Sequence, residues 1–388
     1  MKRIISVALV LALGVMIDVA DETTEVYKVL YQQAQGLPQK YAAILNIVGL
    51  NDKNTAPVLA SALEELLLTQ DAYSATIDQE LYGKTITLLC KALGDYKDDA
   101  AAASLWTTVQ DVPDPLAKAE ALISIGKLRD RDYAERIALK LRDLNFKPTE
   151  DTDAGEKIAC GCIVSLGKLK DVRGFSPVFF ATDAWYSQRV RQQASESLSS
   201  IVDDPTDAIE AIIKSEPAER QLRALTAETH SRATNQRKID TAVLALNLGH
   251  LKIANDKAEA KSLCDLRKLA LCSFIAYKAT GADPVDGCLS SYTKGFDDEE
   301  KLLGLAALGI NGSDSAATVL RDILLNLNND QQSGIADETR NRLAKAGIDA
   351  SAVSKNKIVK PVLVAISINE KWSGGIIAAA QTAIKALQ

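Results

Sequence analysis

The sequence has few of the residues on which metal centres and catalytic sites usually depend. It contains two histidines and six cysteines in 388 residues, and only 5% of its residues are aromatic. His230 and His250 lie outside any His-Glu-x-x-His motif, and the cysteines lack the paired spacing of zinc ligands. A nucleophile elbow and a glycine-rich dinucleotide-binding fingerprint are also absent. We therefore predict a protein that is not an enzyme, with no catalytic residue, no metal site and no small-molecule cofactor, and with both histidines at the surface.

An excess of positive charge is also missing. The formal net charge is −6, with 45 Lys and Arg against 51 Asp and Glu, and the basic residues do not cluster. Nucleic-acid binding generally depends on clustered Lys and Arg that neutralise phosphates, so we expect no nucleic-acid partner. The acidic run at residues 297–300 has the pattern of a helix N-terminus, where carboxylates are favourable, and this explains it without a metal ion.

Only one long apolar run occurs, at residues 4–17, directly after Lys2 and Arg3. A short positive head followed by such a run is typical of a secretory signal peptide, and the run is shorter than the ~20 residues that span a bilayer. We predict a signal peptide at residues 1–20 and a periplasmic or secreted protein. The alternative is that this run forms the first helix of the folded protein, which would then be cytoplasmic.

Export would permit disulfide bonds, but the cysteine spacing restricts them. Cys160 and Cys162 point to different sides of a helix, and Cys264 and Cys272 would lie ~12 Å apart along one helix, too far for a bond. Bridges between neighbouring helices stay open, and buried free thiols are the favoured interpretation. The cysteines concerned are Cys90, Cys160, Cys162, Cys264, Cys272 and Cys288.

A short pattern recurs along the chain: apolar residues, a glycine, a polar turn, and then Asp or Asn. Residues 163–171 read Ile-Val-Ser-Leu-Gly-Lys-Leu-Lys-Asp, and residues 124–130 read Ser-Ile-Gly-Lys-Leu-Arg-Asp. We interpret the pattern as a helix that ends at the glycine, with a positive φ angle at Gly167, followed by an acidic residue that caps the next helix. The glycines of the pattern are Gly49, Gly94, Gly126, Gly167, Gly249 and Gly309, and Ser199 occupies the same place in a degenerate copy.

The shortest spacing between these glycines, 32 residues, fits two helices and two turns, so the chain is predicted to be all-α with about fifteen to eighteen helices. Residues 190–194 (Val-Arg-Gln-Gln-Ala) and 266–270 (Leu-Arg-Lys-Leu-Ala) add a second marker, an apolar residue followed by Arg at the start of a helix pair. With these motifs, most of residues 40–325 resembles the HEAT-repeat family. The resemblance implies antiparallel helix pairs stacked as a right-handed superhelical solenoid that serves as a protein-binding scaffold.

The predicted domain order is the signal peptide at residues 1–20, the HEAT-like solenoid at 21–325 and C-terminal capping helices at 326–388. The boundary is placed in the polar, glycine-containing segment 326–337, which separates the repeats from a less regular region. Within that region, residues 358–368 are rich in β-branched side chains and fit either a strand or a buried helix.

Trp185, Tyr186 and Arg189 form the strongest candidate for a partner-binding site, because these three residue types dominate interface energetics. The alternative is that Trp185 packs between helices and stabilises the turn. Together with the family resemblance, this predicts a non-enzymatic scaffold that binds a protein or peptide along its concave face. Two other functions stay open: a HEAT-like enzyme of the bilin lyase or DNA glycosylase type, and a purely structural envelope protein.

Overall fold

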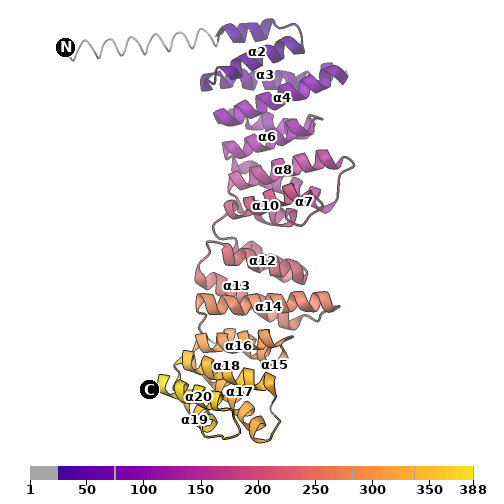
Figure 1. Cartoon of the computed structure of the whole chain (residues 1–388). Helices are drawn as coiled ribbons and strands as arrows, with labels where there is room; N and C mark the ends of the chain where they lie inside the picture. The colour runs from indigo at the N-terminus through magenta and orange to yellow at the C-terminus, as the bar shows by residue number, and fades with distance from the viewer. Residues whose placement is uncertain (1–24, 74–75, 282, 336, 388) are drawn as a thin grey trace, which may run out of the picture. The chain divides into compact units, whose positions relative to one another are not determined.

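The computed structural model describes residues 25–73, 76–281, 283–335 and 337–387 (Figure 1). The predicted signal peptide lies outside these ranges. In the described ranges every regular element is helical and there is no β-strand, so the all-α prediction is confirmed. Residues 358–368 are not a strand: they contribute to a 3₁₀ turn, η6 (Lys357–Val359), and to α19 (Lys360–Ser367). Val362, Leu363 and Ile366 of α19 are buried, which accounts for the apolar composition of this segment.

The chain folds as two compact units, Met1–Val202 and Asp203–Gln388. In unit 1, α4, α6, α8 and α10 pack side by side in chain order as a first layer, and α3, α5, α7 and α9 form a second layer against them. Residues 25–33 are also helical. The unit 1 helices are α2 (Leu37–Gly49), α3 (Ala56–Leu68), α4 (Thr76–Tyr96), α5 (Ala102–Asp111), α6 (Pro115–Leu128), α7 (Ala134–Phe146), α8 (Thr152–Leu169), α9 (Phe175–Ala181) and α10 (Gln188–Ile201).

Unit 2 repeats this two-layer arrangement. Its first layer contains α12, α14, α16, α18 and α20, and its second contains α11, α13, α15, α17 and α19, each in chain order (Figure 1). The remaining unit 2 helices are α11 (Thr206–Ser215), α12 (Ala218–His230), α13 (Asn235–Leu251), α14 (Lys257–Tyr277), α15 (Asp283–Lys294), α16 (Asp298–Asn311), α17 (Asp314–Gln332), α18 (Glu338–Ser354) and α20 (Gly374–Ala386).

The expected number of helices was too low, since α2 to α20 alone make nineteen. The glycine pattern missed helices because no glycine occurs between Gly174 and Gly249, where α11 and α12 follow one another. The predicted boundary segment, residues 326–337, is also partly helical, because α17 continues to Gln332. The predicted capping region then consists of α18, η6, α19 and α20.

The turn that joins a first-layer helix to its second-layer partner has the same form in successive repeats of unit 1. Lys97, Arg129 and Lys170 each adopt a positive φ angle directly after the helix. The next residue is an aspartate whose side chain accepts a hydrogen bond from the backbone N–H two residues further on, at the start of a 3₁₀ turn that leads into the α-helix. The predicted acidic caps are therefore confirmed. The 3₁₀ turns are η3 (Asp99–Ala101), η4 (Arg131–Tyr133) and η5 (Val172–Gly174).

Gly49 is the last residue of α2, but the other pattern glycines lie inside their helices, and Gly167 does not have the positive φ angle predicted for it. Gly94, Gly126 and Gly167 lie in the last turns of α4, α6 and α8, three residues before the positive-φ residue. Close helix packing requires Gly94 and Gly126 instead, whereas a Cβ at Gly167 would lie 3.2 Å from Ser200 Oγ, a tight contact that a small shift can relieve. A Cβ at Gly94 would lie 2.4 Å from Ser124 Oγ, and one at Gly126 would lie 2.7 Å from Ser165 Cα. Small residues thus let the first-layer helices approach closely.

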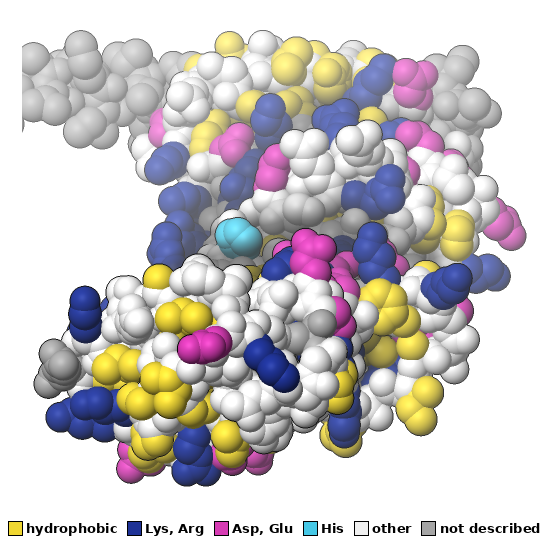
Figure 2. Space-filling view, turned by 60° about the horizontal axis from the view of Figure 1, so that its bottom comes forward, with side chains coloured by type: hydrophobic (Ala, Val, Ile, Leu, Met, Phe, Trp, Pro, Cys, Tyr) yellow, Lys and Arg dark blue, Asp and Glu magenta, His cyan; other side chains and the backbone are white. Residues whose placement is uncertain are grey.

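All six cysteines are free thiols, and four of them are buried. None of the helices in the described ranges is long and apolar enough to cross a lipid bilayer. Hydrophobic side chains gather at the end of unit 2 that faces the viewer in Figure 2. Val364 of α19 and Ile368, which directly follows α19, are exposed.

Candidate functional site

Trp185, Tyr186 and Arg189 lie in unit 1, at the connection between α9 and α10. The rings of Trp185 and Tyr186 contact each other with centroids 4.6 Å apart. The Trp185 indole N–H donates to the Leu144 carbonyl at 2.8 Å, and the Tyr186 hydroxyl is 3.0 Å from Asn145 Oδ1. Both acceptors are at the end of α7, so the two aromatic side chains tie this connection to the preceding repeat.

The three predicted residues differ in how far they are buried. Tyr186 is only 2% exposed, and burial raises the pKa of its hydroxyl well above the usual range. Trp185 is half-buried, while Arg189 is exposed on the first turn of α10. The packing role considered for Trp185 is therefore present, and it extends to Tyr186. Partner binding stays a prediction, carried mainly by Arg189 and the exposed part of Trp185.

A cavity of about 480 Å³ opens two repeats earlier in unit 1. It lies where η2 (Gln70–Tyr73) and α4 meet the connection between α5 and α6. Sequence reasoning missed it because its walls come from segments about 30–40 residues apart, none of which carries a recognisable motif. Its lining residues are Gln70, Asp71, Tyr73, Gln79, Glu80, Tyr82, Pro113 and Asp114.

The cavity and the Trp185 segment lie on the same edge of unit 1. The connections that lead from a second-layer helix into the next first-layer helix all emerge on this edge, because the first-layer helices lie side by side in chain order. We call it the inter-repeat edge. It comprises the connections between α3 and α4, α5 and α6, α7 and α8, and α9 and α10, at the described residues 69–73, 112–114, 147–151 and 182–187.

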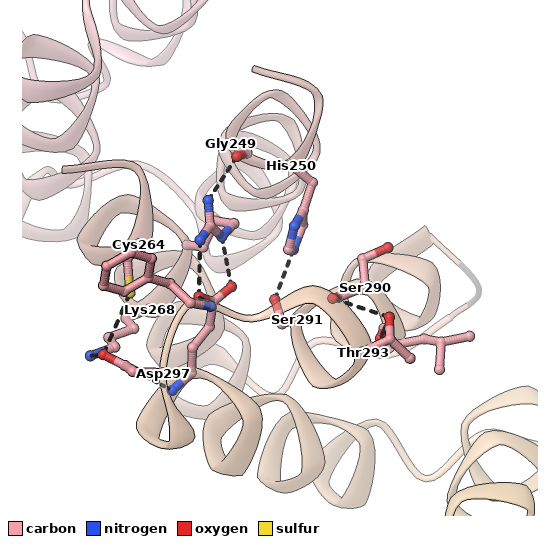
Figure 3. Close-up of polar contacts among 12 residues, drawn as sticks. Gly249, His250, Cys264, Lys268, Ser290, Ser291, Thr293 and Asp297 are labelled. Carbon is pink, nitrogen blue, oxygen red and sulfur yellow. Dashed lines mark hydrogen bonds and ion pairs between the residues drawn. The ribbon is translucent and has the colours of Figure 1, made fainter. Parts of the chain in front are cut away.

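The densest polar network of unit 2 joins α13, α14 and α16 (Figure 3). Glu300 is fully buried, and its two carboxylate oxygens accept from Arg267 Nε at 2.6 Å and from Arg267 Nη2 at 3.0 Å. Arg267 Nη1 also donates to the Gly249 carbonyl at 2.8 Å. Burial alone would raise the pKa of Glu300, but the hydrogen bonds and charge of Arg267 hold it below its ordinary value. This ion pair fastens three helices together.

His250 is not in a surface turn, as expected from the sequence, but in the last turn of α13. Its Nε2 is 2.9 Å from the hydroxyl oxygen of Ser291, as Figure 3 shows. Ser291 is completely buried, so this pair cannot present a nucleophile to a substrate in this conformation. Burial, with the nearby positive charge of Arg267, lowers the pKa of His250 to about 4. The contact is therefore a structural one between α13 and α15. His230, in contrast, is exposed as predicted.

The acidic run at residues 297–300 begins α16, as predicted. Asp297 caps the helix by accepting from the Glu300 backbone N–H at 2.9 Å. Lys268 Nζ lies 2.7 Å from Asp297 and 2.6 Å from Glu299, so an ammonium group neutralises these carboxylates. Across the described part of the chain, no group of three His, Cys, Asp or Glu side chains is arranged to hold a metal ion.

The candidate residues Trp185 and Arg189 and the cavity therefore lie on or beside the inter-repeat edge of unit 1, and the network of unit 2 is structural. No protein-family model matches the chain, and a search of curated proteins returns no match.

Proposed function

We propose that this protein is a non-enzymatic scaffold of the HEAT-repeat type that binds a protein or peptide. The observation that carries the proposal is the order of packing within each unit, where every helix lies against its neighbours in sequence. Such stacks bury a continuous core and leave long surfaces on which extended partners make many contacts. The proposal includes a right-handed superhelical turn of the stacked pairs and export by the N-terminal apolar run.

The composition of the polar sites supports binding over catalysis. The buried titratable groups of unit 2 are held in hydrogen bonds to other helices, and the hydroxyl of Ser291 is inaccessible. The exposed candidate residues, Trp185 and Arg189, are of types that contribute strongly to protein interfaces.

The experiment is cross-linked capture of partners from the envelope of the producing cell, followed by binding measurements with each captured protein purified separately. Arg189→Ala should weaken the purified interaction, because it removes an exposed side chain of a type that contributes strongly to interfaces, beside Trp185. Arg191→Ala is the matched control, since Arg191 is also exposed on α10 but two residues further on and thus on a different face.

Two outcomes would overturn the scaffold proposal: no captured protein binds after purification, or the purified chain turns over a nucleobase or tetrapyrrole substrate. Cell fractionation with intact-mass analysis tests export separately. A full-length product in the cytoplasm would contradict the export part of the proposal, and partners would then have to be captured from the cytoplasm.

A further inference from the structure

We propose that the inter-repeat edge of unit 1 recognises a basic segment of the partner, with one arginine or lysine side chain inserted into the cavity between η2, α4 and the α5–α6 connection. The inference rests on the proposed function, because it names the chemistry of the partner that the scaffold binds. It follows from an asymmetry of charge between the two edges of the unit and from the lining of the cavity.

The edge opposite the inter-repeat edge is electrically balanced. It contains the turns between α2 and α3, α4 and α5, α6 and α7, and α8 and α9, at residues 50–55, 97–101, 129–133 and 170–174. These turns carry six acidic and six basic residues, so their net charge is zero. The acidic residues are Asp52, Asp98, Asp99, Asp130, Asp132 and Asp171, and the basic residues are Lys53, Lys97, Arg129, Arg131, Lys170 and Arg173.

The inter-repeat edge is acidic. Its four connections carry five acidic residues and one basic residue, a net charge of −4. A surface potential of one sign attracts a partner of the opposite sign and orients it before contact. Because the two edges belong to the same repeats, the excess of negative charge is a property of the inter-repeat edge and not of the whole unit. The acidic residues are Asp71, Asp114, Glu150, Asp151 and Asp183, and the basic residue is Lys147.

Besides the negative charge of the edge, the cavity offers a space for one side chain and an aromatic wall. Its volume of about 480 Å³ is in the range of small-molecule sites and admits a long side chain. Tyr73 and Tyr82 form one wall, with ring centroids 5.6 Å apart and planes inclined by 24°. The faces of such rings attract a guanidinium or ammonium group, and a planar guanidinium can also stack on them.

Asp114 and Tyr82 of the cavity are held in place by the backbone around them. Asp114 Oδ1 accepts from the Leu116 N–H at 2.8 Å and so caps α6. A Cβ at position 83 would lie 2.0 Å from Asp114 Oδ2, so only glycine at this place in α4 leaves room for the carboxylate. The Tyr82 hydroxyl donates to the Leu66 carbonyl at 3.1 Å, which fixes the ring. The site is therefore largely formed before a ligand arrives, which lowers the entropic cost of binding.

The lining contains three carboxylates and no Lys or Arg. Glu80 forms an exposed ion pair with Lys84 one helical turn away, at 2.6 Å, which an incoming cation can replace at small cost. An anionic ligand would instead be repelled by Asp71, Glu80 and Asp114, and a purely apolar ligand would displace water from these carboxylates without replacing its hydrogen bonds. The lining thus selects a cation.

Exposed apolar side chains border this edge and indicate that the partner is a protein segment and not a free amine. Leu68, at the end of α3, is 88% exposed, and Phe146, at the end of α7, is 92% exposed. Leu68 precedes the lining residue Gln70 by two positions. Apolar residues beside the inserted basic side chain would cover these groups.

The test uses the full chain and short blocked peptides in calorimetric titration or saturation-transfer NMR. The probe is Gly-Gly-Arg-Gly-Gly, compared with peptides that carry lysine, or citrulline as the neutral isostere, in place of arginine, and with free arginine amide. The arginine peptide should bind about tenfold or more tightly than the citrulline peptide, because citrulline keeps the shape but lacks the charge.

Variants locate the binding. Asp71→Asn with Glu80→Gln should weaken the arginine peptide about five- to thirtyfold, while Asp143→Asn, an exposed carboxylate on α7, should leave it unchanged. Tyr73→Phe should leave the affinity for the arginine peptide unchanged, because the aromatic face that attracts a cation is retained. Tyr73→Leu removes that face and should weaken the affinity about two- to thirtyfold. Circular dichroism confirms that each variant is folded.

Equal affinity for the arginine and citrulline peptides, or no effect of the Asp71 and Glu80 substitutions, would overturn the inference. Free arginine amide binding as tightly as Gly-Gly-Arg-Gly-Gly would show that the ligand is a small cation and would contradict the protein segment. Failure here leaves the capture experiment with Arg189→Ala intact, so the cavity and the scaffold proposals fail independently.

Discussion

The pKa of His250 makes a quantitative prediction about acid stability. The folded protein holds this pKa at about 4, whereas an unfolded chain restores it to about 6.5. Burial of the half-buried ring is the main cause, the positive charges of Arg267 and Lys294 add to it, and Glu300 opposes it. Because the folded state binds its proton less readily, stability is complete above pH ~6.5 and falls as the pH decreases towards 4.

The magnitude follows from the difference of about 2.5 pKa units, which corresponds to about 3 kcal/mol once the pH has fallen below 4. Water near the half-buried ring screens part of this, so about 2 kcal/mol is expected between pH 7.5 and pH 4.5. His250→Gln keeps a polar group opposite Ser291 but cannot be protonated. The wild-type protein should therefore lose about 2 kcal/mol more than this variant over the same pH interval.

The assay is urea unfolding of the full chain, followed by the fluorescence of Trp372. This residue belongs to unit 2, is 3% exposed, and donates its indole N–H to Asn328 at 2.8 Å. Trp106→Phe and Trp185→Phe remove the unit 1 signals from the background. His230→Gln is the control, because His230 is exposed and is the other histidine of the chain. Parallel pH dependence of the wild-type and His250→Gln proteins would refute the reasoning.

Three further predictions concern stability. Glu300→Gln should lower the free energy of unfolding in urea by about 3–5 kcal/mol, because it leaves Arg267 buried without a counter-charge. The double substitution Arg267→Met with Glu300→Leu should recover much of that stability, and an additive loss would contradict the reasoning. Gly126→Ala should cost about 1–3 kcal/mol, as its Cβ would be 2.7 Å from the backbone of Ser165, while Gly49→Ala, with open space around it, should be neutral or slightly stabilising; equal melting temperatures would disprove the packing role. Asp171→Ala should cost about 0.5–2 kcal/mol and speed hydrogen exchange at η5 selectively, and unchanged exchange there would show that the cap is dispensable.

The sequence by itself determined the helical class and the position of many helix starts. Asp130, Asp171 and Asp297 each cap a helix or 3₁₀ turn through a backbone N–H two or three residues away, so the signal and its partner occupy the same short segment. The apolar periodicity of the helices is equally local. Interactions over so few residues can be recognised without knowing which helices become neighbours.

The roles of the pattern glycines needed the tertiary structure. Gly126 and Ser165 are 39 positions apart, and their contact depends on how closely α6 and α8 approach. The same holds for Tyr186 and Asn145, which are 41 positions apart. Their hydrogen bond shows that Tyr186, predicted from the sequence to bind a partner, packs against the preceding repeat. Arg267 and Glu300, and the walls of the acidic cavity, likewise come together only when separate repeats stack. Local sequence specifies where each helix begins, but the sites depend on distances between helices, and those arise only when the repeats pack against one another.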